Sequence, residues 1–439
     1  MAPPPLTLTP LATAPDPADA FAAVAARRRD VFWLDAGPAA SGGWSWVGWG
    51  EAVDADHVRA VHAVGDRAVS DSPALDAGPF RGGWVGWAGY ESGATRAAAP
   101  VHDESGEVDG EAWLRVRGLV AFDHATGRAW SGGEADVITA APGSGMPVPA
   151  DRARDEASAP ARPVRSRHTP DEYAALIERC RDAIRAGDAY QLCLTTRFAV
   201  EGDIDAVATF LALRAATPAH HGGIIRIGEA ALVSASPERF LQVEGDTVRT
   251  RPIKGTRPRG SDAATDAALA AELRADVKER AENVMIVDLM RNDLSRVCVP
   301  ASVRVEKLLE VESYSAVHQL VSTVAGTLPA TATVGDLLDA AFPAGSMTGA
   351  PKLSAMTLLH ALEGGPRGVY AGCFGWVGAG GGLDLAMVIR SIVVHPGGAY
   401  VGAGGGITWR SVAAAEVAEV GLKARAPLAA LGAAVPAGW

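Results

Sequence analysis

Strand-like segments come in runs along this chain instead of alternating one by one with helices, and this order restricts the fold most. Short stretches rich in Trp, Val and Gly follow one another at residues 31–37, 42–49 and 80–91. Two more strands are predicted close together at 223–228 and 231–237. A doubly wound parallel sheet needs regular βαβ units, so the order favours an α+β fold.

Helix signals are strongest after residue 168. Thr169 begins a Thr-Pro-Asp-Glu start signal, and the amphipathic segment that follows ends at Gly187. A 3.6-residue apolar period predicts a long helix with a break over residues 264–296. Further helices are predicted near 204–216, 334–341 and 352–362, further strands at 190–200, 369–378 and 384–395, and a strand and a helix at the end of the chain.

Composition divides the chain into three regions. Residues 1–140 form an N-terminal lobe with aromatic, glycine-punctuated strands. Residues 141–168 are rich in Pro, Ala, Ser and charge, which is typical of a linker or a surface loop. Residues 169–439 carry the stronger helix and strand patterns and form the third region.

Charge and cysteine content exclude several classes of protein. A formal net charge of −11 argues against non-specific binding to nucleic acids or anionic membranes. We find no apolar stretch long enough for a membrane helix and no signal peptide. The four cysteines have no paired spacing, which disfavours a disulfide framework or a zinc site. We therefore expect a soluble cytoplasmic protein.

Lysine is rare in this sequence. Lys and Arg total 40, yet only five residues are lysines, and the first of them is Lys254. An amine can lose its proton and act as a nucleophile, whereas a guanidinium effectively cannot. Each lysine is therefore a candidate for chemistry that arginine does not perform.

Four segments carry candidate reactive groups. Glu238 lies in SASPERF, Lys254 in RPIKGTRPRG and Glu282 in KERAENVMIVDLMRNDL. In EVAEVGLK, Glu416 and Glu419 share a helix face with Lys423. Taken singly, each has an ordinary interpretation as a solvated helix face, a loop lysine or a turn-capping carboxylate. The glycine-rich segments match neither a P-loop nor a dinucleotide-binding fingerprint.

Together and in this order, the segments closely resemble the chorismate-utilising enzymes. The motifs IRAGDAYQ, VHQLVSTVAG, FPAGSMTGAPK, YAGCFGWVG and GAGGGI extend the resemblance over nearly the whole chain. The family fold implied is a large two-lobed α+β unit, with two sheets stacked as a β-sandwich core and helices packed outside. The resemblance also makes residues 169–439 the chorismate-binding catalytic region. Residues 1–140 and 169–439 would then be lobes of one core.

The resemblance implies a magnesium site. Matching the motifs makes Glu282 and Glu419 the Mg²⁺ ligands, with Glu416 close by and Lys423 near the metal. Mg²⁺ prefers oxygen and commonly takes one or two carboxylates together with substrate and water. In this family the metal holds the ring carboxylate of chorismate.

The resemblance also implies how the rest of chorismate is bound. The enolpyruvyl carboxylate would be held by Arg390, Tyr370 and backbone N–H groups near Gly404 and Gly406; an arginine suits a planar carboxylate. The ring pocket would be lined by Gly255, Thr256, His318 and Thr348, with His318 acting near the C4 hydroxyl. Glu238 matches the general acid for that hydroxyl, a carboxyl group that keeps its proton near neutral pH.

The loop around Lys254 separates the branches of the family. Pro-Ile-Lys-Gly-Thr is the form found in aminodeoxychorismate synthases, in which the lysine is thought to attack C2 and form a covalent adduct. That attack needs a neutral amine, which we expect burial and cationic neighbours to promote. Gln191 stands where the water-using branch has a lysine, so that branch is disfavoured. The expected reaction is amination of chorismate at C4.

The expected activity implies a partner and has two rivals. The expected activity needs ammonia, and the segments matched include no glutaminase nucleophile turn, so we expect a separate glutaminase subunit as partner. A rival in the same class is anthranilate synthase component I or an aminating relative from secondary metabolism. A rival of a different class is a non-catalytic, chorismate-binding regulatory subunit.

Overall fold

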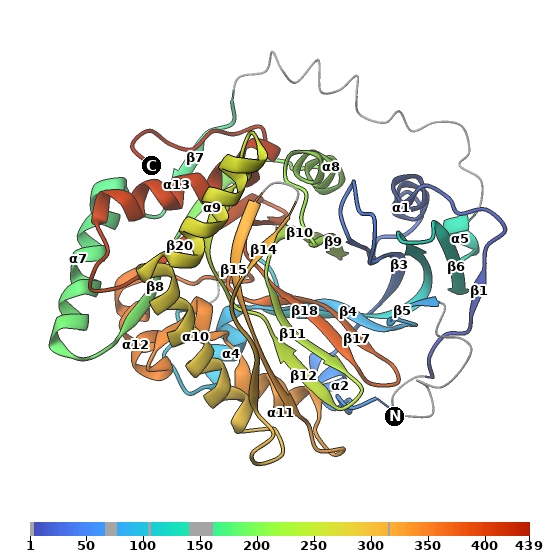
Figure 1. The fold of residues 1–439 in the computed structure, drawn as a ribbon. Helices are drawn as coiled ribbons and strands as arrows, with labels where there is room; N and C mark the ends of the chain where they lie inside the picture. Colours follow the sequence, from blue (N-terminus) through green and yellow to red (C-terminus); the bar gives the residue numbers. More distant parts are fainter. Residues whose placement is uncertain (1–3, 66–76, 104–106, 140–160, 315–316) are drawn as a thin grey trace.

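The computed structural model describes residues 4–65, 77–103, 107–139, 161–314 and 317–439 (Figure 1). In this part of the chain, antiparallel ladders join twenty strands into one hydrogen-bonded network, with helices outside it. This confirms the predicted α+β fold class. The N-terminal strands are β1 (Leu8–Pro10), β2 (Val31–Asp35), β3 (Trp44–Val53), β4 (Gly83–Ala88), β5 (Glu111–Asp123) and β6 (Arg128–Gly133).

The later strands and the helices complete the fold. The strands are β7 (Val164–Ser166), β8 (Gln191–Glu201), β9 (His221–Ile227), β10 (Ala230–Ser236), β11 (Arg239–Glu244), β12 (Thr247–Thr250), β13 (Ile253–Pro258), β14 (Arg304–Ser313), β15 (Val317–Thr327), β16 (Gly349–Ala350), β17 (Cys373–Gly378), β18 (Leu383–Met387), β19 (Ser391–His395) and β20 (Gly398–Ile407). The helices are α1 (Pro17–Ala25), α2 (Ala55–Arg59), α4 (Tyr90–Arg96), α5 (Asp136–Thr139), α7 (Pro170–Ala186), α8 (Ala206–Ala216), α9 (Ala263–Ala275), α10 (Val277–Ser295), α11 (Val334–Ala341), α12 (Lys352–Glu363) and α13 (Ala413–Ala430), with a 3-10 turn η2 (Gly345–Met347).

Two hydrophobic layers hold the sheets and helices together. Successive side chains of a strand point to opposite faces, and β2 shows the result: Phe32 belongs to one buried cluster and Trp33 to the other. The first cluster includes Trp84 and Phe374. The second fills the space under the outer helices, where α7 and α13 lie side by side over β8 and β20 (Figure 1). Both faces of β2 are therefore buried, which explains its continuous apolar sequence from Val31 to Leu34.

Strands from the two ends of the chain share ladders. β2 pairs with β9, and β4 pairs with β17. The predicted linker over residues 141–168 lies mostly outside the described residues, and its last part forms β7 against β8. The division into regions 1–140 and 169–439 stays a prediction. In the part of the chain that the structure describes, no helix is long and apolar enough to cross a membrane.

Local signals in the sequence set several boundaries correctly. Thr169 caps α7 through a capping box with Glu172, and Gly187 ends it with a φ of +88°. The predicted break within residues 264–296 lies at Asp276, which is the N-cap of α10. Its side chain accepts the backbone N–H groups of the first helical turn, and this ends α9 and starts α10.

Two predicted strands differ from the observed ones. The segment 384–395 is not one strand but two, β18 and β19, and Arg390 lies between them with a φ of +52°. The strand predicted at 369–378 begins only at Cys373, because Ala371 has a φ of +64°. A left-handed residue cannot continue an extended strand. Both breaks flank residues predicted to bind substrate.

Candidate active site

Gly255 forms a bulge in β13 directly after Lys254. The ladder with β15 shifts register between Lys254 and Thr256, so Gly255 is the extra residue. Its φ is +77°, and a Cβ there would lie 2.7 Å from Leu273 Cδ1. A bulge bends its strand and redirects neighbouring side chains. The glycine after the lysine therefore shapes the backbone that presents the Lys254 amine.

Acidic groups surround the amine of Lys254. Burial lowers the pKa of Lys254, but Glu282, Glu238 and Glu419 raise it, and the net direction is upward. The prediction that cationic neighbours favour a neutral amine is wrong for the protein alone. Carboxylates favour the ammonium form, so a nucleophilic role for Lys254 requires these charges to be offset when ligands bind.

Glu238 lies in the turn between β10 and β11. Its side chain is buried, with 8% of the residue exposed, and its backbone N–H lies 3.4 Å from Ser236 Oγ. Burial raises the pKa of Glu238 to about 7, although Lys254, Ser346 and Lys423 lower it. A substantial share of molecules therefore carries a proton on this carboxyl group at neutral pH. The direction of this pKa agrees with the predicted general acid, and the role of Glu238 at the substrate stays a prediction.

The amine of Lys278 contacts two carboxylates, those of Glu282 in α10 and Glu416 in α13. The Lys278 Nζ atom lies 3.5 Å from Glu416 Oε1 and 3.8 Å from Glu282 Oε1. Both carboxylates are buried, and burial raises the pKa of Glu282. Within the described residues, Glu282 Oε1 has no hydrogen-bond partner. Leaving such an oxygen unpaired is costly, and a hard cation would use it as a ligand.

Glu419 lies one turn further along α13 and pairs with Lys423. The Lys423 Nζ atom lies 2.7 Å from Glu419 Oε1 and donates to Gly404 O at 2.8 Å. In the described ranges, no three His, Cys, Asp or Glu side chains gather closely enough to hold a metal ion alone. A cation here would thus take one or two carboxylates from the chain and its remaining ligands from substrate and water, as Mg²⁺ commonly does.

A run of glycines in β20 makes room for these polar groups. A Cβ on Gly406 would overlap Gln191 Nε2 and lie 3.7 Å from Lys254 Nζ. A Cβ on Gly405 would lie 3.2 Å from Glu416 Oε2. The buried Oε1 of Gln191 has no hydrogen-bond partner among the described residues. Because Gly405 and Gly406 have no side chains, the polar groups of Gln191, Lys254 and Glu416 can lie close to the backbone of β20.

Arg390 and Tyr370 form a second polar region. Among the described residues, the partly buried Arg390 guanidinium makes no ion pair and no side-chain hydrogen bond. Burial lowers the pKa of Arg390, and the nearby Tyr370 raises it. The ring of Tyr370 lies directly over Gly402, where a side chain would clash. A buried, unpaired arginine has its donors available for a carboxylate, which fits the predicted role.

Besides Gly255, three residues are predicted to line the ring pocket, and they differ in their surroundings. Thr348 is buried, and its Oγ1 donates to Ala344 O at 3.2 Å. Thr256 is exposed. The ring nitrogens of His318 contact Ser313 Oγ at 2.8 Å and Asp266 Oδ1 at 2.9 Å. A role for His318 at the substrate stays a prediction, because its ring would first have to leave these partners.

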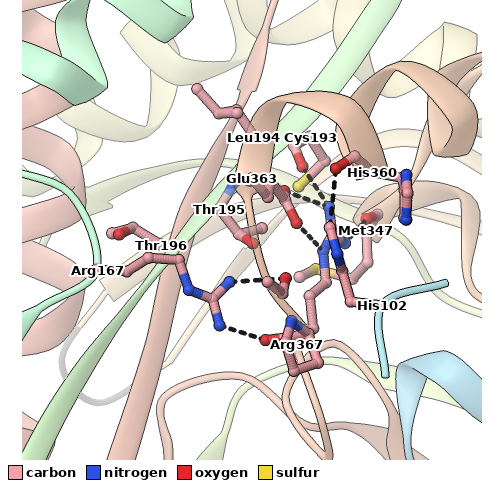
Figure 2. Close-up of polar contacts among 12 residues, drawn as sticks. His102, Arg167, Cys193, Leu194, Thr195, Thr196, Met347, His360, Glu363 and Arg367 are labelled. Atoms are coloured by element: carbon pink, nitrogen blue, oxygen red, sulfur yellow. Dashed lines mark hydrogen bonds and ion pairs between the residues drawn. The ribbon is translucent and has the colours of Figure 1, made fainter. Parts of the chain in front are cut away.

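Sequence reasoning missed two groups of residues. Lys278 is one, although its i,i+4 spacing to Glu282 on a predicted helix was a visible signal. The other is the buried pair of Glu363 and Arg367 next to Cys193 and Met347 (Figure 2). Their i,i+4 spacing was also visible, but the burial that makes the pair important is a property of the tertiary structure.

Arg367 joins three segments of the active-site wall. Its guanidinium contacts both oxygens of Glu363 at 2.7 and 2.8 Å and donates to Met347 O and Cys193 O (Figure 2). Glu363 in turn accepts the Thr195 N–H at 2.8 Å. These bonds fix β8, which carries Gln191, against η2 and the segment before β17. A fully bonded buried network of this kind holds a site in one geometry.

Comparison with known proteins agrees with this architecture. The family described as chorismate binding enzyme matches residues 29–429. The chain is 42% identical to an aminodeoxychorismate synthase of Streptomyces pristinaespiralis, over 80% of this chain and 51% of that protein. It is 38% identical to anthranilate synthase component 1 of Streptomyces coelicolor, over 94% of this chain and 86% of that one. The chain spans about half the length of the aminodeoxychorismate synthases it matches.

Solved structures show the same fold. Anthranilate synthase component I from Streptococcus pneumoniae superposes with a TM-score of 0.70 at 27% identity, covering 98% of this chain and 93% of that one. The menaquinone-specific isochorismate synthase of Escherichia coli superposes with a TM-score of 0.69 at 18% identity, covering 98% and 95%. The chain belongs to the chorismate-binding enzymes.

Proposed function

We propose that this protein aminates chorismate at C4 to form 4-amino-4-deoxychorismate, the reaction of an aminodeoxychorismate synthase component I. The observation that carries the proposal is the combination of a lysine amine in the Pro-Ile-Lys-Gly-Thr bulge with a buried carboxyl group of pKa about 7 beside it. An amine nucleophile and a proton donor are the two groups that this substitution needs. Similarity to named aminodeoxychorismate synthases supports the proposal.

The proposed reaction has two substitutions. The neutral Lys254 amine attacks C2, the two ring double bonds shift, and the C4–O bond breaks. Glu238 gives its proton to the departing hydroxyl group, which leaves as water. Ammonia then attacks C4, the double bonds shift back, and the C2–N bond breaks to release Lys254 as a neutral amine. The proton lost by the new ammonium group at C4 returns to Glu238. The residues proposed to line the ring are Gly255, Thr256, His318 and Thr348. Gln191 is proposed to contact it.

Carboxylate recognition is assigned to two places. Arg390 and Tyr370, with backbone N–H groups of Gly404 and Gly406, are proposed to hold the enolpyruvyl carboxylate. Glu282 and Glu419, with Glu416 nearby, are proposed to hold Mg²⁺, and the buried Oε1 of Glu282, which has no hydrogen-bond partner among the described residues, supports this. When bound, the cation would supply positive charge that offsets the ring carboxylate and the acidic side chains. Lys423 is proposed to keep Glu419 in place.

Ammonia is proposed to come from a separate glutaminase subunit or, in the test tube, from ammonium salts. We propose that the enzyme works in the cytoplasm. The four cysteines are all free and buried, which suits a reducing compartment.

Anthranilate synthase component I is the second candidate. It is favoured by the match to the Streptomyces coelicolor protein, which covers more of both chains than the aminodeoxychorismate synthase match. Its reaction needs ammonia at C2, where our proposal puts Lys254. A non-catalytic chorismate-binding subunit is the candidate of a different class. It would not need Lys254, Glu238 and the carboxylates to converge.

A product assay separates the three candidates. The protein is incubated with chorismate, Mg²⁺ and ammonium chloride, and the products are identified by mass spectrometry. We expect an aminated ring that still carries the enolpyruvyl group, and 4-aminobenzoate only after a lyase is added. Direct release of anthranilate would support the second candidate, and unchanged chorismate would support the third.

Lys254→Ala tests the covalent step. We expect the C4 amination rate to fall by at least about 10³-fold, because removal of a nucleophile leaves only binding and electrostatic effects. Lys307→Ala is the matched control, since Lys307 lies on exposed β14 and pairs with Glu310. Full activity of Lys254→Ala would exclude the proposed adduct.

A further inference from the structure

Lys278 occupies the space between two buried carboxylates. Its Nζ contacts Glu416 and Glu282 from one side, and within the described residues no other lysine or arginine forms an ion pair with either. Two buried carboxylates without a cation would repel each other and lose hydration. Lys278 therefore supplies positive charge to both carboxylates in the metal-free protein, and Lys254 also lowers the pKa of Glu282.

The Lys278 side chain is partly exposed to solvent, and its contacts with the two carboxylates are long. Its side chain is 42% exposed, and it projects from the first turn of α10, next to the exposed Val277. The two contacts at 3.5 and 3.8 Å are longer than the 2.7 Å bond between Lys423 and Glu419. A flexible ammonium side chain with long contacts exchanges easily with solvent. By comparison, the shorter Lys423 contact and its bond to Gly404 O hold that lysine in place.

We propose that Lys278 is a resident counter-ion that competes with a divalent cation for Glu282 and Glu416 and so sets the affinity of the site for Mg²⁺. The ammonium group and the cation both carry positive charge, and both use the same carboxylate oxygens. Close approach of one raises the free energy of the other. Binding of Mg²⁺ therefore moves the Lys278 amine outward. The inference rests on the proposed function only for the identity of the cation.

Lys278→Met tests the competition directly. The change removes the charge and keeps most of the length of the side chain. Isothermal titration with Mg²⁺ alone, without substrate, should show about a tenfold lower Kd than the wild type, which corresponds to about 1.4 kcal/mol. Lys307→Met is the matched control: it also removes one lysine charge, on the exposed strand β14, and should leave the Kd unchanged.

Thermal unfolding gives a second readout that does not depend on activity. Without Mg²⁺, Lys278→Met should unfold at a lower temperature than the wild type, because its two carboxylates lack a counter-ion. With Mg²⁺, its melting temperature should rise more than that of the wild type. Lys278→Gln should behave in the same direction, and far-UV circular dichroism confirms that each variant is folded.

The outcomes distinguish this inference from the proposed reaction. Unchanged or weaker Mg²⁺ binding in both variants would overturn the inference, since it would make Lys278 a supporting partner of the bound cation. Failure of the wild type and both variants to bind Mg²⁺ would overturn it as well. If the two Lys278 variants bind Mg²⁺ more tightly than the wild type, but the wild type does not aminate chorismate at C4, the result would support the inference and contradict the proposed function.

Discussion

Glu238→Gln gives the sharpest test of the electrostatics of the site. The folded pKa of Glu238 is about 7, raised from 4.5 by burial. Between these two values the folded protein keeps a proton that the unfolded chain releases, so stability falls as pH rises. The contribution is fully present below pH 4.5 and is lost as pH rises through 7. A glutamine cannot ionise and does not carry this penalty.

The size of the effect follows from the shift. Each pKa unit corresponds to about 1.4 kcal/mol, so the whole shift amounts to about 3.4 kcal/mol, of which about 2.5 kcal/mol falls between about pH 5 and pH 8. Urea unfolding of the wild type and Glu238→Gln should therefore differ more at pH 8 than at pH 5. The free energy of unfolding of the variant, relative to the wild type, should rise by about 2.5 kcal/mol over this range.

A difference between the two proteins that does not change with pH would refute this reasoning, because it would mean that Glu238 ionises in the folded protein near its ordinary pKa. Glu419→Gln serves as the control, since the pKa of Glu419 is lowered and not raised. It should show no such gain at high pH. In activity assays, Glu238→Gln should lose C4 amination at every pH, because it has no proton to give.

Two further predictions concern the walls of the site. Arg367→Met should lower the free energy of unfolding by about 3–5 kcal/mol, because it leaves the buried Glu363 carboxylate without a counter-ion, whereas Arg181→Met, at a surface pair with Glu178, should cost at most about 1 kcal/mol. Equal losses in urea unfolding would contradict this. Gly406→Ala should lower C4 amination by about 10²-fold, because the new methyl group displaces Gln191 beside Lys254, and Gly42→Ala, in open space, should not. A normal rate of C4 amination in Gly406→Ala would show that the site tolerates a side chain at this position of β20.

Much of the local structure could be predicted because its causes lie close together in the sequence. The cap at Thr169, the stop at Gly187 and the break at Asp276 each depend on one side chain or one glycine and its nearest neighbours. The strand break at Arg390 was not predicted, because its cause does not lie close by in the sequence. A positive φ in an arginine has no local signal, since it is imposed by the packing around β18 and β19.

The identity of the candidate site residues was also open to sequence reasoning, but their electrostatics were not. Motif order selected Lys254, Glu238 and Glu282 without showing that acidic groups surround the lysine. The direction of the Lys254 pKa was predicted wrongly, because it depends on carboxylates from α10, α13 and the turn before β11, which are far apart in the chain.

By itself, the sequence determined the fold class, several element boundaries and the residue types available for chemistry. Only the tertiary structure decided which charges meet: Lys278 with Glu282 and Glu416, Arg367 with Glu363, and Lys254 with the acidic groups around it. The physical reason is range. Caps and turns are set by a few neighbouring residues, whereas the energy of a charge depends on burial and on every charged group that folding brings near it.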